Sequence, residues 1–556
     1  MADAPGHAMT DALASGAGGA GVAGRRRQPV ALATLCMVLF LTFVDITIVS
    51  VALAGIHQQL NTSVSALQWV IGAYALTFAS SMLVFGTVGD QFGRKKVMLA
   101  GVGVYCVGAL MAALSIMLAT SHHGAHSHLD KSLALAILLA GRAVMGLGAA
   151  ASEPGTLSML RHVYPEYTSR NRALGVWAAV SGFSLALGPV IGGALVYGWS
   201  WRAIFFFDVA FGLVAFALAS WVLPENADPD TAGIDVPGAV FGAAALGALI
   251  FALMQAENAG YGSPLVIALL CISTASFALF VWRERRAAHP LLDLSFLRLP
   301  RFATPNVVAF CTYFATFALF SFTALFLQEV SGYNGGQIAE AFLPMTVLMI
   351  LASVLAGRWT DVVGIRASIV AGCAAFTLGL LLTSAVLSPT PRYLPLAAAL
   401  ALTGIGMGTC VVPITSSVLA VVPPERSGMA ASTTNTSREV GTALGVAVLG
   451  ALTISKLLSS LIAGLNRLQI PPVFQSVVIN GVLTGQAPSA GKSSTQAPPG
   501  QGRLVTEVIQ SAYSAFESGL HLALYVSAGL VFAAGVLTAI TINAGGAQAD
   551  HRAASG

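Results

Sequence analysis

The chain has 556 residues, of which 56% are hydrophobic and only 9% are charged, and its formal net charge is +4. This composition excludes a water-soluble globular protein, because too little polar surface is available to cover it. The small net charge gives no reason to expect a nucleic-acid partner, and we expect none. The six cysteines lie inside apolar segments without paired spacing, which argues against a disulfide framework or a metal site.

Residues 1–24 are rich in Gly and Ala, and we expect them to form a disordered cytoplasmic tail. The rest of the chain is dominated by apolar segments of about the 20 residues that a helix needs to cross a bilayer. Fourteen such segments follow in order, at 30–55, 66–88, 97–119, 132–157, 173–197, 203–223, 236–256, 264–282, 305–328, 338–356, 367–388, 394–421, 438–463 and 519–543. The fold class that we predict is an all-α integral membrane protein with 14 transmembrane helices.

Two six-helix bundles with two extra central helices account for this number. The predicted parts are an N-terminal bundle at 25–224, two inserted helices and a cytoplasmic linker at 225–304, a C-terminal bundle at 305–543 and a cytoplasmic tail at 544–556. Within the C-terminal bundle, the low-complexity segment 465–515 is interpreted as an external loop.

The distribution of basic residues sets the orientation. With a cytoplasmic N-terminus, nineteen Lys and Arg residues lie in inside segments, seven lie outside, and Arg142 alone lies within the membrane. Basic residues gather on the cytoplasmic side of membrane proteins, so both termini are predicted to be cytoplasmic. Arg outnumbers Lys 22 to 5, which is typical of a GC-rich bacterial genome and favours a bacterial plasma membrane.

A short charged sequence motif, called a phrase below, occurs twice between apolar segments. Its first copy has Gly86, Asp90 and Gly93 followed by Arg94, and its second copy places Asp361 between Gly357 and Gly364 with the same spacing. A repeated turn at equivalent positions indicates two related halves, as in carriers that rock one half against the other. We expect Gly86, Asp90, Gly93, Arg94 and Asp361 to form conformation-dependent contacts; the alternative is a purely topological role that keeps positive charge inside.

Placing an ionisable side chain inside the membrane costs roughly 2.5–3.5 kcal/mol of free energy, so each one requires an explanation. Asp45 in the first segment and Arg142 in the fourth both lie near mid-membrane, in a water-filled crevice between the halves. Asp45 is the predicted protonation site and Arg142 the cation that tunes it; the alternative is a static ion pair. Glu153 shares the helical face of Arg142 and is a candidate proton relay, or else a helix-end carboxylate that reaches interfacial water.

The fifth segment contains Gly188, Pro189, Gly192 and Gly193. Glycines allow neighbouring backbones to approach closely, and proline bends a helix. We interpret this run as a pliable seam between the two halves, with ordinary close packing as the alternative.

Further polar and aromatic side chains are weaker candidates. Trp69, Tyr74 and Trp177 are candidates to line a substrate cavity through cation–π contacts, with lipid-interface or packing roles as the alternative. Glu340 is a candidate to face the same cavity. Asp208, near the start of the sixth segment, is predicted to pair with Arg202.

Several of these motifs together resemble the major facilitator superfamily, in particular its fourteen-helix drug:proton antiporter branch. The resemblance rests on DITIVSVAL at 45–53, GTVGDQFGRKK at 86–96, LLAGRAVMGLGAA at 138–150, LGPVIGG at 187–193, WRAIF at 201–205 and NTSREVGTALG at 435–445. The sequence departs from the usual pattern at Ala54, where a Pro is usual, at Ser184, where a Gly is usual, and at Asp208, where an Asn is customary. The resemblance covers nearly the whole chain outside the tail and residues 465–515.

This resemblance implies alternating access, coupling to protons and export from the cytoplasm. We expect a monomeric antiporter, not an enzyme, that exports amphipathic small molecules such as drugs, with protons and the lipid bilayer as its other partners and without cofactor or metal. A narrow-specificity carrier for one endogenous metabolite and a membrane enzyme or sensor that kept the carrier fold are the alternatives.

Overall fold

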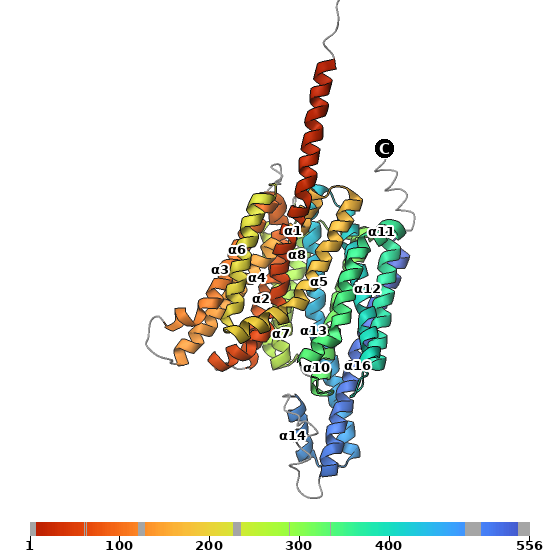
Figure 1. The fold of residues 1–556 in the computed structure, drawn as a ribbon. Coiled ribbons are helices and arrows are strands. Elements are labelled where there is room, and N and C mark those ends of the chain that lie inside the picture. The colour runs from red at the N-terminus through yellow and green to blue at the C-terminus, as the bar shows by residue number, and fades with distance from the viewer. Residues whose placement is uncertain are drawn as a thin grey trace, which may run out of the picture. The chain divides into compact units, whose positions relative to one another are not determined.

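The computed structural model describes residues 7–60, 62, 64–120, 128–225, 235–287, 290–333, 335–483 and 502–542. Within these residues every regular element is helical, so the all-α prediction is confirmed (Figure 1). The α-helices are α1 (His7–Leu60), α2 (Val64–Phe92), α3 (Arg94–Thr120), α4 (His128–Val163), α5 (Tyr167–Gly198), α6 (Arg202–Val222), α7 (Val236–Ala259), α8 (Pro264–Glu284), α9 (Pro300–Phe317), α10 (Thr323–Glu329), α11 (Gly335–Val386), α12 (Tyr393–Ala420), α13 (Ser427–Arg467), α14 (Pro472–Leu483) and α16 (Gly502–Thr541). Three short elements, η1 (Phe296–Arg298), η2 (Ala318–Phe322) and η3 (Pro424–Arg426), lie between them.

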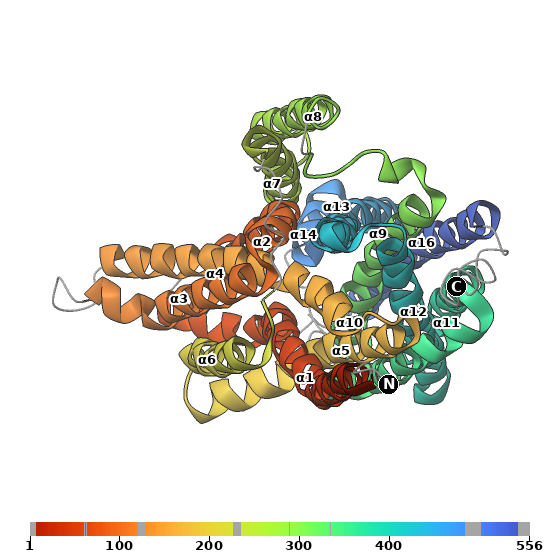
Figure 2. The ribbon, with the colours of Figure 1, turned by 90° about the horizontal axis from the view of Figure 1, so that it is seen from above.

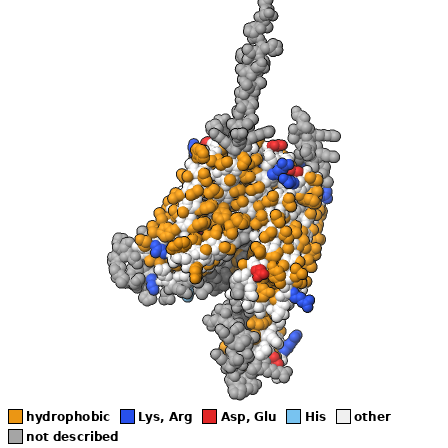
Figure 3. All heavy atoms as spheres, viewed as in Figure 1, with side chains coloured by type: hydrophobic (Ala, Val, Ile, Leu, Met, Phe, Trp, Pro, Cys, Tyr) orange, Lys and Arg blue, Asp and Glu red, His pale blue; other side chains and the backbone are white. Residues whose placement is uncertain are grey.

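The described helices match the predicted membrane-spanning segments. Among the described residues, 11 helices are long and apolar enough to cross a membrane. One of them, α11, has 52 residues and non-helical backbone at Gly364, so it is two helices joined at a kink. Its second half, α5 and the α9–η2–α10 segment complete the fourteen predicted segments, each of which falls on helix. Hydrophobic side chains cover most of the face shown in Figure 3, as a lipid-facing surface requires.

The chain divides into two compact units. Unit 1 consists of residues 1–243, 280–292 and 422–432, and unit 2 contains the remaining residues. The predicted insertion at 225–304 is therefore divided between the units, although α7 and α8 lie side by side (Figure 2). Ser273 of α8 donates a hydrogen bond to the carbonyl of Ala245 in α7, which helps to join the two helices.

Unit 1 is a bundle of closely packed helices. Helix α4 packs against α3 and α2, α1 packs against α5 and α6, and α6 also packs against α3. Two glycine pairs, Gly101 with Gly148 and Gly108 with Gly141, bring the backbones of α3 and α4 together. A Cβ on Gly141 would lie only 2.8 Å from the carbonyl oxygen of Gly108, so a larger residue does not fit there. Small residues permit this close approach inside a membrane, where dispersion contacts hold helices together.

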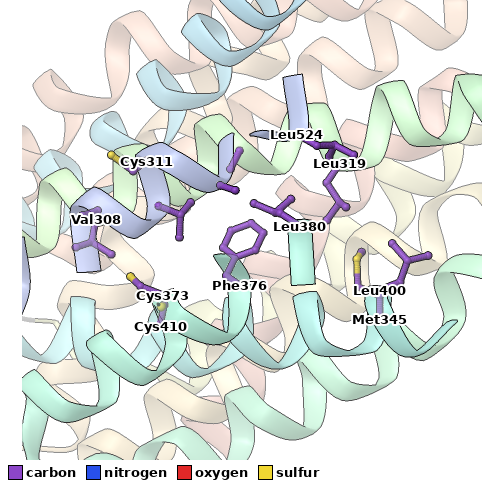
Figure 4. Close-up of a cluster of buried hydrophobic side chains, with 14 of the residues drawn as sticks. Val308, Cys311, Leu319, Met345, Cys373, Phe376, Leu380, Leu400, Cys410 and Leu524 are labelled. Atoms are coloured by element: carbon purple, nitrogen blue, oxygen red, sulfur yellow. Dashed lines mark hydrogen bonds between the residues drawn. The ribbon is translucent and has the colours of Figure 1, made fainter. Parts of the chain in front are cut away.

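Unit 2 is built around α11 and α12, against which α9 and α16 pack. Its core is a cluster of buried apolar side chains from these helices, shown in Figure 4. Phe376 of α11, Leu319 of η2 and Leu524 of α16 are fully buried within it. The cluster thus joins helices from distant parts of the chain.

The last glycine of the repeated turn has a positive φ in both units. Gly93 has φ 103° and Gly364 has φ 84°, both in the left-handed region that side chains with a Cβ avoid. The glycine that ends each copy of the phrase is therefore required by the turn.

Two segments differ from the sequence-based expectation of irregular structure. Helix α1 begins at His7, so residues 7–24 are helical; residues 1–6 lie outside the described residues. Segment 465–515 contains α14 and the start of α16. Apolar contacts among α13, α14 and α16, which include Leu461, Val478 and Ala512, stabilise this helical extension.

Gly93→Ala tests the conformational requirement of the first turn. Forcing a residue with a Cβ into the left-handed region costs about 1–2 kcal/mol, so the variant should melt at a lower temperature in detergent. Gly89→Ala is the matched control, because a Cβ on Gly89 meets nothing within 4 Å and the residue lies within α2. Equal melting temperatures for the two variants would contradict the assignment.

Candidate functional site

A buried ion pair between α1 and α4 is the main polar feature of unit 1. Nη1 of Arg142 lies 2.7 Å from both Oδ1 and Oδ2 of Asp45. Asp45 is 0% exposed and Arg142 is 1% exposed. Their meeting was predicted from depth alone, but the pair lies in the protein interior and not in the water-filled crevice that the sequence suggested.

Helix α2 holds the guanidinium of Arg142 in place. Nε of Arg142 donates to the carbonyl of Val70 at 2.8 Å, and its Cζ lies 4.7 Å from the centroid of the Tyr74 ring. The hydroxyl of Tyr74 donates to the carbonyl of Thr42 in α1 at 3.2 Å. Tyr74 is also a predicted substrate contact; in the structure its ring lies against Arg142 and its hydroxyl bonds to α1.

Close packing of α2 on α4 makes this arrangement possible. A Cβ on Gly146, one turn after Arg142, would lie 3.1 Å from the backbone nitrogen of Phe78. The hydroxyl of Thr77 donates to the carbonyl of Ala143 at 2.9 Å across the same interface. Because the two backbones approach so closely, the side chain of Arg142 can reach the carbonyl of Val70 and donate a hydrogen bond to it.

The pair is costly to form and costly to break. Removing two charges from water costs several kcal/mol per ion, and a good mutual geometry is needed to repay it. A proton on Asp45 would abolish the charge that compensates Arg142. The position of the Arg142 guanidinium therefore depends on whether Asp45 is ionised or protonated.

A second carboxylate, Asp208 of α6, lies in the interior near this pair. It is 0% exposed, and neither oxygen has a hydrogen-bond partner among the described residues. The predicted pairing with Arg202 is wrong, since Nε of Arg202 donates to the carbonyl of Ala113 in α3. Side chains meet along a helix at spacings of three or four residues, and these two are six apart. The spacing was the signal that could have identified Asp208 as a buried acid.

The first copy of the repeated turn binds the start of α13. Oδ1 of Asp90 accepts a hydrogen bond from the backbone nitrogen of Gly428 at 3.0 Å, and Oδ2 accepts one from Met429 at 2.9 Å. A carboxylate at the N-terminus of a helix satisfies free N–H groups and interacts favourably with the helix dipole. Arg94 pairs with Asp90 at 2.9 Å and donates to the carbonyl of Pro424 at 2.6 Å. All these residues belong to unit 1.

The same contact has two further contributors. A Cβ on Gly86 would lie 2.7 Å from the carbonyl oxygen of Gly428, so the backbones cross at van der Waals distance. Arg161, at the end of α4, donates to the carbonyl of Val422 at 2.9 Å; the sequence reasoning did not assign it a role. In unit 2, Asp361 lies partly buried in α11, three residues before the kink at Gly364.

The glycines of α5 contact α1. A Cβ on Gly188 would collide with the hydroxyl of Thr47, and one on Gly192 would lie 2.9 Å from Cγ1 of Ile48. A Cβ on Gly193 meets nothing within 4 Å. The contacts of the first two glycines thus lie inside unit 1, next to Asp45, whereas the sequence predicted a seam between the halves. Pro189 lies within α5 between them.

The remaining candidates lie on α4, α2 and α11. Glu153 is 2% exposed and lies three turns after Arg142 in α4. Trp69 is partly buried in α2, and Glu340 is exposed near the start of α11.

Comparison with known proteins identifies the family. The family model for the Major Facilitator Superfamily matches residues 35–446. The chain therefore belongs to this superfamily, as its motifs predicted. It is 30% identical to "Multidrug resistance protein Stp" of Mycobacterium tuberculosis over 465 residues, covering 84% of this chain and 83% of that protein. It is 27% identical to "Drug efflux pump JefA" of the same species over 522 residues, covering 92% and 97% of the two chains.

Another relative and two solved structures agree with this assignment. The chain is 30% identical to the "Methylenomycin A resistance protein" of Bacillus subtilis, covering 76% of this chain and 86% of that protein. The human organic anion transporter MFSD10 has a similar fold, with TM-score 0.56 and 14% identity over 93% of this chain and 99% of that one. The proton:xylose symporter XylE gives TM-score 0.59 at 10% identity, covering 92% and 95%. The names of the relatives agree with the drug:proton antiporter branch.

A double-substitution cycle tests the energetics of the ion pair. Asp45→Leu removes the carboxylate that Nη1 of Arg142 contacts and should destabilise the protein by about 3–5 kcal/mol. Asp45→Leu combined with Arg142→Met removes both charges and should be less destabilising than either single substitution. Thermal melting of the purified variants in detergent measures this, and a simple sum of the two single effects would contradict it.

Gly188→Ala and Gly193→Ala form a matched pair on α5. The first places a methyl group against Thr47 and should destabilise the protein by about 1–3 kcal/mol through overpacking. The second enters open space and should be neutral or slightly stabilising, because Ala favours helix over Gly by about 1 kcal/mol. Melting curves of both variants decide the matter, and the reverse order would refute the proposed packing of α5 on α1.

Proposed function

We propose that this protein is a proton-coupled antiporter that exports amphipathic small molecules by alternating access. The observation that carries the proposal is the fully buried pair of Asp45 and Arg142 in a chain of this superfamily. Its relatives are named for multidrug resistance and drug efflux. We place the protein in a bacterial plasma membrane with both termini in the cytoplasm, in keeping with the distribution of its basic residues.

Protonation of Asp45 is the proposed coupling event. An incoming proton neutralises the carboxylate and removes the attraction that holds the guanidinium of Arg142. The freed cation then either takes another partner or changes its position, because an unpaired charge cannot remain in the interior at low cost. Loss of the proton to the cytoplasm restores the pair. Glu153, on the same helix, is the proposed relay in that direction.

The repeated turn is the proposed conformational switch. Asp90 accepts two hydrogen bonds from backbone N–H groups in the first turn of α13, and Arg94 pairs with Asp90 and donates to the carbonyl of Pro424 in η3. We propose that these contacts exist in one transport state and are released in the other, with Asp361 at the equivalent turn of unit 2. Gly86 and Gly93 permit the close approach and the turn itself.

The substrate is proposed to be a drug-like molecule with apolar and aromatic parts. Trp69, Tyr74 and Glu340 are the proposed substrate contacts, and the ring of Tyr74 also lies against Arg142. A monomer contains both halves and is the proposed transport unit, and no catalytic reaction is part of the proposal.

Narrow specificity is the second candidate. Several relatives are named for resistance to a single antibiotic, namely methylenomycin A, tetracenomycin C and puromycin. A carrier that exports one such metabolite would use the same proton chemistry with a more selective binding site.

Inside-out membrane vesicles test the proposed function. When respiration has acidified the vesicle interior, addition of a substrate should lower the internal proton concentration as drug enters and protons leave. Asp45→Asn should reduce this response to the background of vesicles without the protein, because its side chain cannot exchange a proton. Glu166→Gln removes an exposed carboxylate at the start of α5 and should respond like wild type.

The choice of compounds separates the two candidates. The panel contains an amphipathic cationic dye, puromycin, tetracenomycin C and methylenomycin A. Responses to several members support a broad exporter, and a response to one supports a narrow carrier. Absence of any response from the wild-type protein, or an undiminished response from Asp45→Asn, would refute proton-coupled export through this pair.

A further inference from the structure

Asp208 of α6 is a buried acid that the proposed mechanism does not yet use. Its side chain is 0% exposed, and no described residue donates a hydrogen bond to either of its oxygens. Buried polar groups in proteins are almost always hydrogen-bonded, so an isolated carboxyl group requires an explanation. An ionised carboxylate in such a place would be far more costly than a neutral carboxylic acid.

The packing of α6 places this acid among apolar groups. Just before Asp208 in the helix, Phe205 is fully buried and the ring of Phe207 packs against that of Phe211. The ring centroid of Phe211 in turn lies 5.1 Å from that of Phe40 in α1. One turn after Asp208, a Cβ on Gly212 would lie 2.5 Å from Sγ of Cys106 in α3. The close contact with α1 and α3 leaves little room for solvent.

The titratable and charged groups around Asp208 come from three helices. Asp208 interacts electrostatically with Asp45 of α1 and Arg142 of α4. On α3, Tyr105 and Cys106 also lie within its electrostatic range. The hydroxyl of Tyr105 is directed to the carbonyl of Leu41, which it approaches at 3.5 Å. Arg142 is thus the cation with which both carboxylates interact electrostatically.

Two carboxylates and one guanidinium set the number of protons in this cluster. With both acids ionised the cluster carries a net negative charge in the membrane interior, and with one proton bound it is neutral. Both short contacts of Nη1 go to Asp45, so Asp45 is the ionised partner in this structure. The single proton therefore belongs on Asp208.

We propose that Asp208 is a second proton-binding residue of the transporter, which holds a proton while Asp45 is paired with Arg142. When Asp45 takes up a proton, Asp208 releases its own and becomes the counter-charge of Arg142. One proton enters the cluster and one leaves it, so the cluster remains neutral in both states. This proposal rests on the proposed function, because it supplies the alternative partner that the freed Arg142 needs there.

Infrared spectroscopy of the purified protein tests the proposal directly. A protonated carboxylic acid absorbs through its C=O stretch, apart from ionised carboxylates and from the amide bands. At pH 7 the spectrum of wild type minus that of Asp208→Asn should contain one such band, which shifts in heavy water. The corresponding difference for Asp45→Asn should contain the same lost acid band, because Asp208 must ionise to become the counter-charge of Arg142 once the Asp45 carboxylate is gone. The band isolates Asp208 from other protonated acids, because they cancel in the subtraction.

A second variant protects the test against misfolding. Asp208→Glu keeps a carboxylic acid and should replace the band by one at a different frequency. If Asp208→Asn does not fold, as judged by its melting curve, the difference between wild type and Asp208→Glu provides the same information. Absence of an acid band in both differences would show that Asp208 is ionised and would overturn the proposal.

The result is independent of transport. An Asp208 band in a protein that gives no drug-driven proton movement in vesicles would refute the antiporter function and leave the protonation of Asp208 established. Drug-driven proton movement without an Asp208 band would refute the second proton site alone.

Discussion

The pairing of Asp45 with Arg142 is the interaction on which the arrangement of unit 1 depends. Both side chains are excluded from solvent, so each needs the other at hydrogen-bonding distance. That distance is reached only because α1, α2 and α4 pack closely, with Gly146 against α2 and Gly188 against α1. The small residues and the buried charge pair thus act together. The glycines allow the helices to approach closely, and the charges specify which helices must come together.

Much of the fold could be predicted from the sequence, because the bilayer imposes a length and a polarity on every helix. The fourteen apolar segments and the repeated Gly-Asp-Gly turn were sufficient for this. Contacts between particular side chains were harder to predict, because they depend on which face of a helix packs against which neighbouring helix. Asp45 and Arg142 were predicted to meet from their depth, whereas depth gave no indication that Tyr74 would lie against Arg142. Asp208 was paired with the wrong residue because proximity in sequence was taken for proximity on the helix surface.

Charge neutrality connects the buried groups with the mechanism. The membrane interior tolerates few uncompensated charges, so a proton that arrives at one acid changes what its neighbours can do. The contact of Asp90 and Arg94 with the start of α13 follows the same principle at the end of a helix, where free N–H groups and a carboxylate compensate each other. In both places the polar contact is strong when made and costly when left half made, and this property suits a protein with two stable conformations.

Helices α13 and α16 have 41 and 40 residues, about twice the number needed to cross the hydrocarbon core. Together with α14 they form a helical projection with its own apolar core. Helices of this length extend beyond the hydrocarbon core, so the projection gives the molecule a landmark outside it. An antibody fragment raised against it would add ordered mass for particle alignment in electron microscopy, and its binding to intact cells would report the sidedness of the membrane directly.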